Sequence, residues 1–161
     1  MKSHPSIPSL KAGVIGTGFI GPVHVEALRR LGVTVIAICD VGDLGAKAAA
    51  QLAIPQAFAN YRDLLACPEV VVVHITTPNR FHCEMSLDAL RAGKHVVCEK
   101  PLAMSTRETA RIVQAARAAK RVFAVNYNVR FYPAVLALRR LVERGELGDI
   151  IHVNGSYMQD W

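Results

Sequence analysis

One glycine-rich segment near the start of the chain constrains the fold more than any other stretch. Residues 16–21 place three glycines in the pattern G-x-G-x-x-G, as the run Gly16, Thr17, Gly18, Phe19, Ile20, Gly21. An apolar run ends at Ile15 just before it, and apolar residues recur at helical spacing from Val23 to Leu31 after it. A second apolar run covers residues 33–39 and ends at Asp40. The glycine pattern alone is weak evidence, but this strand–helix–strand context predicts a dinucleotide-binding βαβ unit.

Each glycine has a separate physical role in such a unit. Gly16 permits the tight turn out of the first strand, Gly18 leaves room for a pyrophosphate, and Gly21 lets the helix pack closely on the strand. The free N–H groups and the dipole at the helix N-terminus stabilise the phosphate charge. The alternative is a turn that binds no phosphate.

Asp40 predicts which dinucleotide binds. It lies 19 positions after Gly21, where a carboxylate can accept two hydrogen bonds from the diol of an adenosine ribose. The same charge repels a 2′-phosphate, and no arginine follows it in residues 41–43. NAD is therefore favoured over NADP, and the alternative role for Asp40 is that of a helix N-cap.

The rest of the chain alternates apolar strand-like runs with helical patterns. Helices are expected over residues 43–53, 61–66, 105–120 and 133–144, together with one that follows residues 76–79 and ends at Gly93. Strands are expected over residues 70–75, 95–98 and 121–126. This alternation predicts an α/β fold with a doubly wound parallel sheet, the Rossmann arrangement.

The last stretch changes character. Ile151, Val153 and Tyr157 alternate with polar residues, which is typical of a strand with one solvated face. We expect residues 1–148 to form the Rossmann domain, with residues 1–10 as a loose arm. Residues 149–161 are expected to be the first strand of a truncated second α/β domain. A lone strand needs a partner, so the chain is expected to form homo-oligomers through this edge.

Composition narrows the class of protein. Apolar residues make up 52% of the 161, enough for a packed core, and no stretch is long enough to span a membrane. No secretory signal is visible, and the four cysteines lack paired spacing, so reduced thiols in the cytoplasm are expected rather than disulfides or a metal site. The net charge of +6 raises the alternative of a nucleic-acid surface. Its basic residues fall in helical patterns without interleaved aromatics, which favours solvated helix faces.

Polar residues follow each central strand at its carboxyl end, where ligands of open α/β sheets bind. Lys100 is the candidate catalytic residue, because a lysine there can hold the hydroxyl oxygen of an alcohol and help to move its proton. Glu99 is expected either to support the nicotinamide or its ribose, or to pair with a nearby base.

The loop after residues 70–75 holds further candidates. The expected cofactor-binding residues there are Thr76, Thr77, Pro78 and Asn79. For Pro78 and Asn79 the alternative is a turn with a helix cap. His82, one turn further on, and His24 are each expected either as ligands or as packing residues. Arg130 is expected to bind an anion or substrate, or to pair with a carboxylate.

Taken together, these motifs resemble the Gfo/Idh/MocA oxidoreductase family. The resemblance covers roughly residues 10–161 and rests on the glycine motif with His24, Asp40, Thr77-Pro78-Asn79 with His82, Glu99-Lys100-Pro101, and residues 126–133 with Arg130. It implies a Rossmann domain followed by a domain built on an open antiparallel sheet. It also implies hydride transfer between a nicotinamide cofactor and a polyol or sugar-like alcohol. In the family, an aspartate and a histidine of the substrate site come from the second domain. After Gly145 no Asp and His lie at helical spacing, and Asp149 and His152, three apart on the expected strand, would face opposite sides.

Three functions remain open at this stage. The first is an NAD-dependent dehydrogenase, for which this chain supplies the cofactor-binding part. The second is a dinucleotide-binding module that is not catalytic. The third is an interaction protein that pairs through its last strand. Turnover of a polyol would separate the first from the second.

Overall fold

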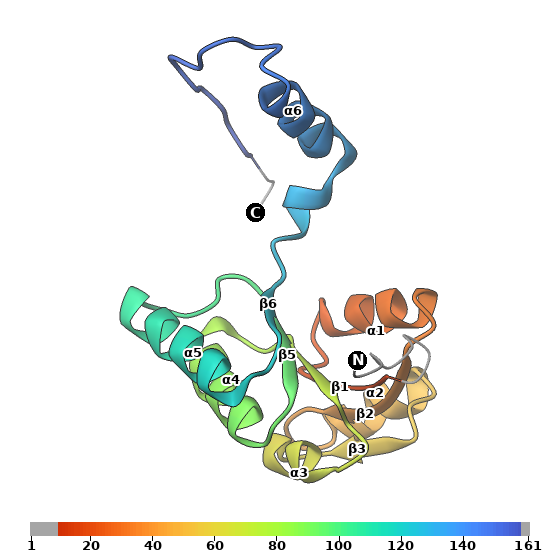
Figure 1. The fold of residues 1–161 in the computed structure, drawn as a ribbon. Coiled ribbons are helices and arrows are strands. Elements are labelled where there is room, and N and C mark those ends of the chain that lie inside the picture. The colour runs from red at the N-terminus through yellow and green to blue at the C-terminus, as the bar shows by residue number, and fades with distance from the viewer. Residues whose placement is uncertain (1–9, 159–161) are drawn as a thin grey trace, which may run out of the picture. The chain divides into compact units, whose positions relative to one another are not determined.

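A six-stranded parallel sheet forms the centre of the first part of the chain. The computed structural model describes residues 10–158. Its strand order is β3-β2-β1-β4-β5-β6, so the chain crosses from one half of the sheet to the other between β3 and β4 (Figure 1). The strands are β1 (Lys11–Ile15), β2 (Thr34–Cys39), β3 (Gln56–Phe58), β4 (Val72–Ile75), β5 (His95–Cys98) and β6 (Phe123–Val125). This order confirms the predicted doubly wound fold and places the switch point between β1 and β4.

Helices cover both faces of the sheet, as Figure 1 shows. The helices of this part are α1 (Gly21–Arg30), α2 (Leu44–Gln51), α3 (Tyr61–Ala66), α4 (His82–Arg91) and α5 (Thr106–Ala119), with a short 3₁₀ turn, η2 (Asn79–Phe81), before α4. Val25 and Leu28 of α1 and Ala48 of α2 share one core with Val14 and Ile38 of the strands. Residues of α3, α4 and α5 form the other core with the opposite sides of the strands. Burial on both faces explains the nearly continuous apolar runs of these strands.

Local signals set several helix ends. The side chain of Asn60 accepts a hydrogen bond from the N–H of Arg62 at 3.0 Å and caps α3. Ser105 caps α5 by accepting from the N–H of Glu108 at 3.2 Å. The carboxylate of Glu108 bonds back to the N–H of Met104.

The end of the chain differs from the expectation. The chain separates into two compact units, Met1–Asn126 and Tyr127–Trp161, and the domain boundary at 148 stays a prediction. The second unit contains a 3₁₀ turn, η3 (Asn128–Phe131), and α6 (Pro133–Glu143). The strand predicted within 149–161 is absent from its described part, residues 149–158, because no neighbouring strand is present there to bond it. Its assignment as the start of a second domain stays a prediction.

Two further expectations can be compared with the structure only within the described residues. The loose arm over residues 1–10 lies almost entirely outside it, as do residues 159–161. Between residues 10 and 158, no helix has both the length and the apolar character needed to cross a membrane.

Candidate functional site

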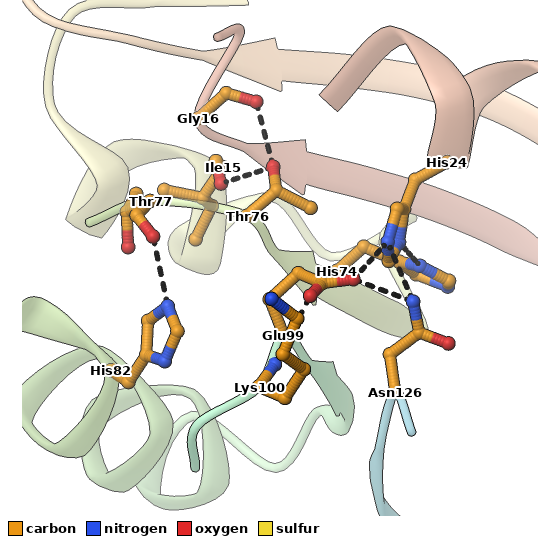
Figure 2. Close-up of polar contacts among 10 residues, drawn as sticks. All are labelled: Ile15, Gly16, His24, His74, Thr76, Thr77, His82, Glu99, Lys100 and Asn126. Carbon is orange, nitrogen blue, oxygen red and sulfur yellow. Dashed lines mark hydrogen bonds and ion pairs between the residues drawn. The ribbon is translucent and has the colours of Figure 1, made fainter. Parts of the chain in front are cut away.

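The glycine turn is fixed tightly to the neighbouring strand β4. Gly16 has φ of +101°, and a Cβ there would lie 2.7 Å from the carbonyl carbon of Thr76. A Cβ on Gly21 would collide with the carbonyl oxygen of Gly16. The buried hydroxyl of Thr76 lies 2.8 Å from that same oxygen and 3.0 Å from the carbonyl of Ile15 (Figure 2). The side chain of Thr76 therefore shapes the turn.

The outer part of the turn is open. Among residues 10–158, nothing beyond the adjoining residues lies within 4 Å of a Cβ built on Gly18, and the side chain of Phe19 is 93% exposed. Helix α1 begins directly behind it, with no capping side-chain bond from Ile20 and no acidic residue in its first turn. The backbone N–H groups at this end of α1 are therefore available to an anionic group.

Asp40 lies across the turn from Gly16, at the end of β2. Its Oδ2 accepts hydrogen bonds from the backbone N–H and the hydroxyl of Thr17, both at 2.6 Å. Its Oδ1 accepts from the N–H of Val41 at 2.7 Å and so keeps acceptor capacity for a further donor. A hollow of about 150 Å³ opens beside this carboxylate, lined by Ile15, Gly16, Cys39, Asp40, Val41, Ala59, Asn60, Tyr61, Thr77 and Met85.

At the end of β5, the side chain of Glu99 is buried in a polar cluster (Figure 2). Its Oε1 accepts from Nε2 of His24 at 3.0 Å and from Nδ2 of Asn126 at 2.5 Å. Its Oε2 accepts from the backbone N–H of Lys100 at 3.1 Å. Burial by itself raises the pKa of Glu99. The hydrogen bonds from Asn126, His24 and the Lys100 N–H together have the larger effect, so the pKa lies below its usual value. Glu99 is thus an ionised carboxylate that pairs with a base, one of its two predicted roles.

A second histidine extends this cluster. Nδ1 of His74, on β4, lies 2.8 Å from Nδ1 of His24. Burial, and then the neighbouring His24, lower the pKa of His74 to about 4, so this ring is neutral at neutral pH. Because Glu99 can only accept, Nε2 of His24 carries a proton, and one more proton lies between the two Nδ1 atoms.

Lys100 differs from its neighbour in being exposed. Its ammonium group has no hydrogen-bond or ion-pair partner within residues 10–158, and it follows the buried Glu99 directly. The peptide bond to Pro101 is cis. The backbone is anchored at Lys100 while its side chain remains available.

The loop after β4 combines exposed and buried candidates. Pro78 and Asn79 are exposed, whereas the hydroxyl of Thr77 contacts Sδ of Met85 at 3.5 Å. His82 is fully buried, and both of its ring nitrogens contact backbone carbonyl oxygens at 2.8 Å. The polar atoms of His82 are therefore already engaged, which favours the packing role over the ligand role.

This geometry agrees with known proteins. A family profile described as "Oxidoreductase family, NAD-binding Rossmann fold" matches residues 10–127. The chain belongs to this family, Gfo/Idh/MocA. It is 34% identical over 164 residues to levoglucosan dehydrogenase from Pseudarthrobacter phenanthrenivorans, covering 95% of this chain and 42% of that protein. It is 34% identical over 154 residues to inositol 2-dehydrogenase from Salmonella typhimurium, covering 92% of this chain and 46% of that protein.

Solved structures give the same result. Levoglucosan dehydrogenase in complex with NADH and levoglucosan matches with a TM-score of 0.81 and 32% identity, over 86% of this chain and 40% of that one. Scyllo-inositol dehydrogenase from Lactobacillus casei, with NAD(H) and scyllo-inositol bound, matches with a TM-score of 0.81 and 25% identity, over 87% of this chain and 42% of that one. The chain thus spans less than half the length of these Gfo/Idh/MocA relatives.

Some residues remain outside this constellation, and others were missed. Arg130 lies on η3 in the second unit with an exposed side chain, so its place in a Gfo/Idh/MocA site stays a prediction. No sequence motif predicts a role for His74 or for the side chain of Asn126. Both occur at or just after the carboxyl end of a strand, which was the available signal.

Two buried cysteines at strand ends, Cys39 and Cys98, are poor nucleophiles. Burial raises the pKa of Cys39 and of Cys98 to about 12, so both remain thiols at neutral pH. Over residues 10–158, no group of histidine, cysteine and acidic side chains is arranged to hold a metal ion.

Proposed function

We propose that this chain binds NAD(H) in its first unit and belongs to a dehydrogenase that acts on a polyol or sugar-like alcohol. The observation that carries the proposal is the pairing of an open glycine turn, before an uncapped α1, with the Asp40 carboxylate beside a hollow. The turn suits a pyrophosphate, and Asp40 suits a ribose diol better than a 2′-phosphate.

The residues divide the cofactor between them. Gly16, Gly18 and Gly21 shape the pyrophosphate site, with the backbone of residues 17–20 around it. Thr77, Pro78 and Asn79 lie after β4, and Lys100 lies after β5, so they suit the nicotinamide half, while the buried Glu99 supports this end of the sheet from within. His82 and Thr76 support these loops from within.

Lys100 is the group we assign to the chemistry. Bound NAD⁺ would supply the hydride acceptor, while the alcohol must also lose its hydroxyl proton. Nζ of Lys100 is exposed and can hydrogen-bond that hydroxyl oxygen. In its neutral form, Nζ can accept the proton as the carbon–hydrogen bond breaks. Glu99 holds the backbone N–H of Lys100 and so orients the residue.

The substrate class follows from the relatives, which are named as dehydrogenases of inositol and levoglucosan. The alternative is a dinucleotide-binding module without catalysis. The test is a pair of fluorescence titrations, with NADH and with NADPH, followed by an assay of polyol oxidation. Binding of NADH in preference to NADPH supports the proposal, and preference for NADPH contradicts it. NADH binding without turnover by the complete enzyme favours the module.

A further inference from the structure

His82 is the most deeply buried histidine among the described residues of the first unit, and its environment is unusual. It is the first residue of α4 and is 0% exposed. Nε2 lies 2.8 Å from the carbonyl oxygen of Thr77 (Figure 2). Nδ1 lies 2.8 Å from the carbonyl oxygen of Pro101. Both ring nitrogens therefore face groups that only accept hydrogen bonds.

A neutral imidazole cannot satisfy this arrangement. It has one N–H and one nitrogen lone pair, so one nitrogen would point its lone pair at a carbonyl oxygen. At 2.8 Å, within normal hydrogen-bond distance, that contact is repulsive. Turning the ring over would replace both nitrogens by carbons and leave the carbonyls and the nitrogens without these bonds. Only the doubly protonated ring donates to both oxygens.

The two carbonyls belong to the two loops that flank the expected nicotinamide site. Thr77 starts the loop after β4, which continues to Pro78 and Asn79. Pro101 belongs to the loop after β5 and directly follows Lys100. We propose that His82 is a doubly protonated positioning residue that clips these two loops together. The assignment of the loops to the cofactor rests on the proposed function, whereas the clip itself rests on the contacts of His82.

The clip completes the anchoring of Lys100. On one side of Lys100, the Glu99 carboxylate is held by His24 and Asn126. On the other side, the Pro101 carbonyl is held by His82. The backbone is thus fixed immediately before and after the exposed lysine. Charge-assisted hydrogen bonds are stronger than neutral ones, so an imidazolium serves this purpose better than an amide.

Nitrogen NMR of the full chain with ¹⁵N-labelled histidine rings tests the protonation state at neutral pH. The expected result is that both ring nitrogens of His82 carry a directly bonded proton that exchanges slowly with water. Comparison with a His82→Gln variant identifies its signals. Should that variant not fold, contacts from the ring protons to Thr77 and Pro101 identify them in the parent chain. A His82 nitrogen without a proton would overturn the proposal.

Cofactor affinity tests the positioning role. A glutamine at 82 can donate to one carbonyl but presents an acceptor to the other, so His82→Gln should weaken NADH binding about tenfold. The matched control is His95→Gln. His95 is half-buried rather than fully buried, and its ring also contacts the backbone, accepting from the N–H of Val122, but it lies at the opposite end of β5. This control should bind NADH like the parent chain.

The two measurements separate the possible failures. Unchanged NADH affinity in a folded His82→Gln variant would overturn the positioning role. Failure of the parent chain to bind NADH would refute the proposed function, and the ring signals would still decide whether His82 is a doubly protonated clip.

Discussion

At the scale of single residues, the glycines of the turn predict different outcomes when a side chain is added. Gly18 has free space around it, so Gly18→Val should leave the fold intact while the new side chain occupies the pyrophosphate site. We expect loss of NADH binding with an unchanged circular dichroism spectrum and melting temperature. Binding equal to that of the parent chain would refute the assignment of this loop.

Gly21 provides the contrasting variant. A Cβ at this position would collide with the carbonyl oxygen of Gly16, which is backbone and cannot move aside cheaply. Gly21→Ala should therefore destabilise the protein itself, by about 1–3 kcal/mol, as overpacking does. Urea denaturation measures this loss, and equal stability of the two variants would contradict the geometry.

Asp40 predicts the choice of cofactor. Asp40→Ala removes the charge that repels a 2′-phosphate and also the two bonds that hold Thr17. NADH should bind more weakly, because the carboxylate no longer accepts two charged hydrogen bonds from the ribose diol, each worth about 1.5–3 kcal/mol at most. Discrimination against NADPH should relax. Asp43→Ala is the control, since Asp43 is exposed and forms a surface ion pair with Lys47. Undiminished preference for NADH in Asp40→Ala would refute this role.

Roles that depend on residues close together in the sequence were easier to predict than contacts between distant residues. The roles of Gly16 and Asp40 followed from spacing within one βαβ unit. The bonds from His24 to Glu99 and from Asn126 to Glu99 join residues 75 and 27 positions apart. No local pattern encodes such pairs, so the sequence could only leave open whether Glu99 binds the cofactor or a base.

At the scale of elements, strong local signals located boundaries well. The bounds of α3 and β5 agree with the prediction, because a cap and flanking turn residues define them. The three-residue β3 was missed, as it exists only through its pairing with β2. The strand predicted within 149–161 was wrong over the described residues for the same reason. Alternation describes a preference, but a strand forms only beside another strand.

Because burial of the His74 ring near the end of β4 lowers its pKa, we expect the stability of the protein to depend on pH. The folded-state pKa of His74 is lowered from 6.5 to about 4. Above pH 6.5 the ring is neutral in both states, and the full stability is present. As the pH falls towards 4, the unfolded chain binds a proton that the folded chain does not, so stability is lost. At about 1.4 kcal/mol per pKa unit, the loss is about 3 kcal/mol.

The variant His74→Asn tests this dependence, because asparagine does not titrate. Urea denaturation at several pH values should show a smaller loss of stability below pH 6.5 than in the parent chain. His152→Asn, an exposed position in the second unit, is the control and should keep the parent profile. An unchanged profile in His74→Asn would mean that burial of this ring has no effect on acid stability.

At the scale of the whole molecule, this chain alone is expected to bind NADH but to turn over little or no polyol. The chain covers only 42–46% of the length of its dehydrogenase relatives. Lys100 can hold an oxygen, but hydride transfer also requires a second wall that excludes water. The measurement is absorbance of NADH formed from polyol and NAD⁺. A steady rate that disappears in Lys100→Ala would show that this chain is sufficient.

Exposed apolar side chains on the second unit lead us to expect self-association. Ile151 and Val153 are 96% and 82% exposed, and Leu138 and Val142 of α6 are 55% and 43% exposed. Burying a few hundred Å² of such surface against a second copy would contribute several kcal/mol, at ~25 cal/mol per Å², before the cost of association. We expect a weak to moderate dimer by sedimentation at tens of micromolar. The paired substitution Ile151→Ser and Val153→Ser should shift it towards monomer, whereas Val41→Ser, at an exposed position of the first unit, should not. A parent chain that sediments as a monomer, or a dimer that persists after removal of residues 149–161, would exclude this surface as the contact.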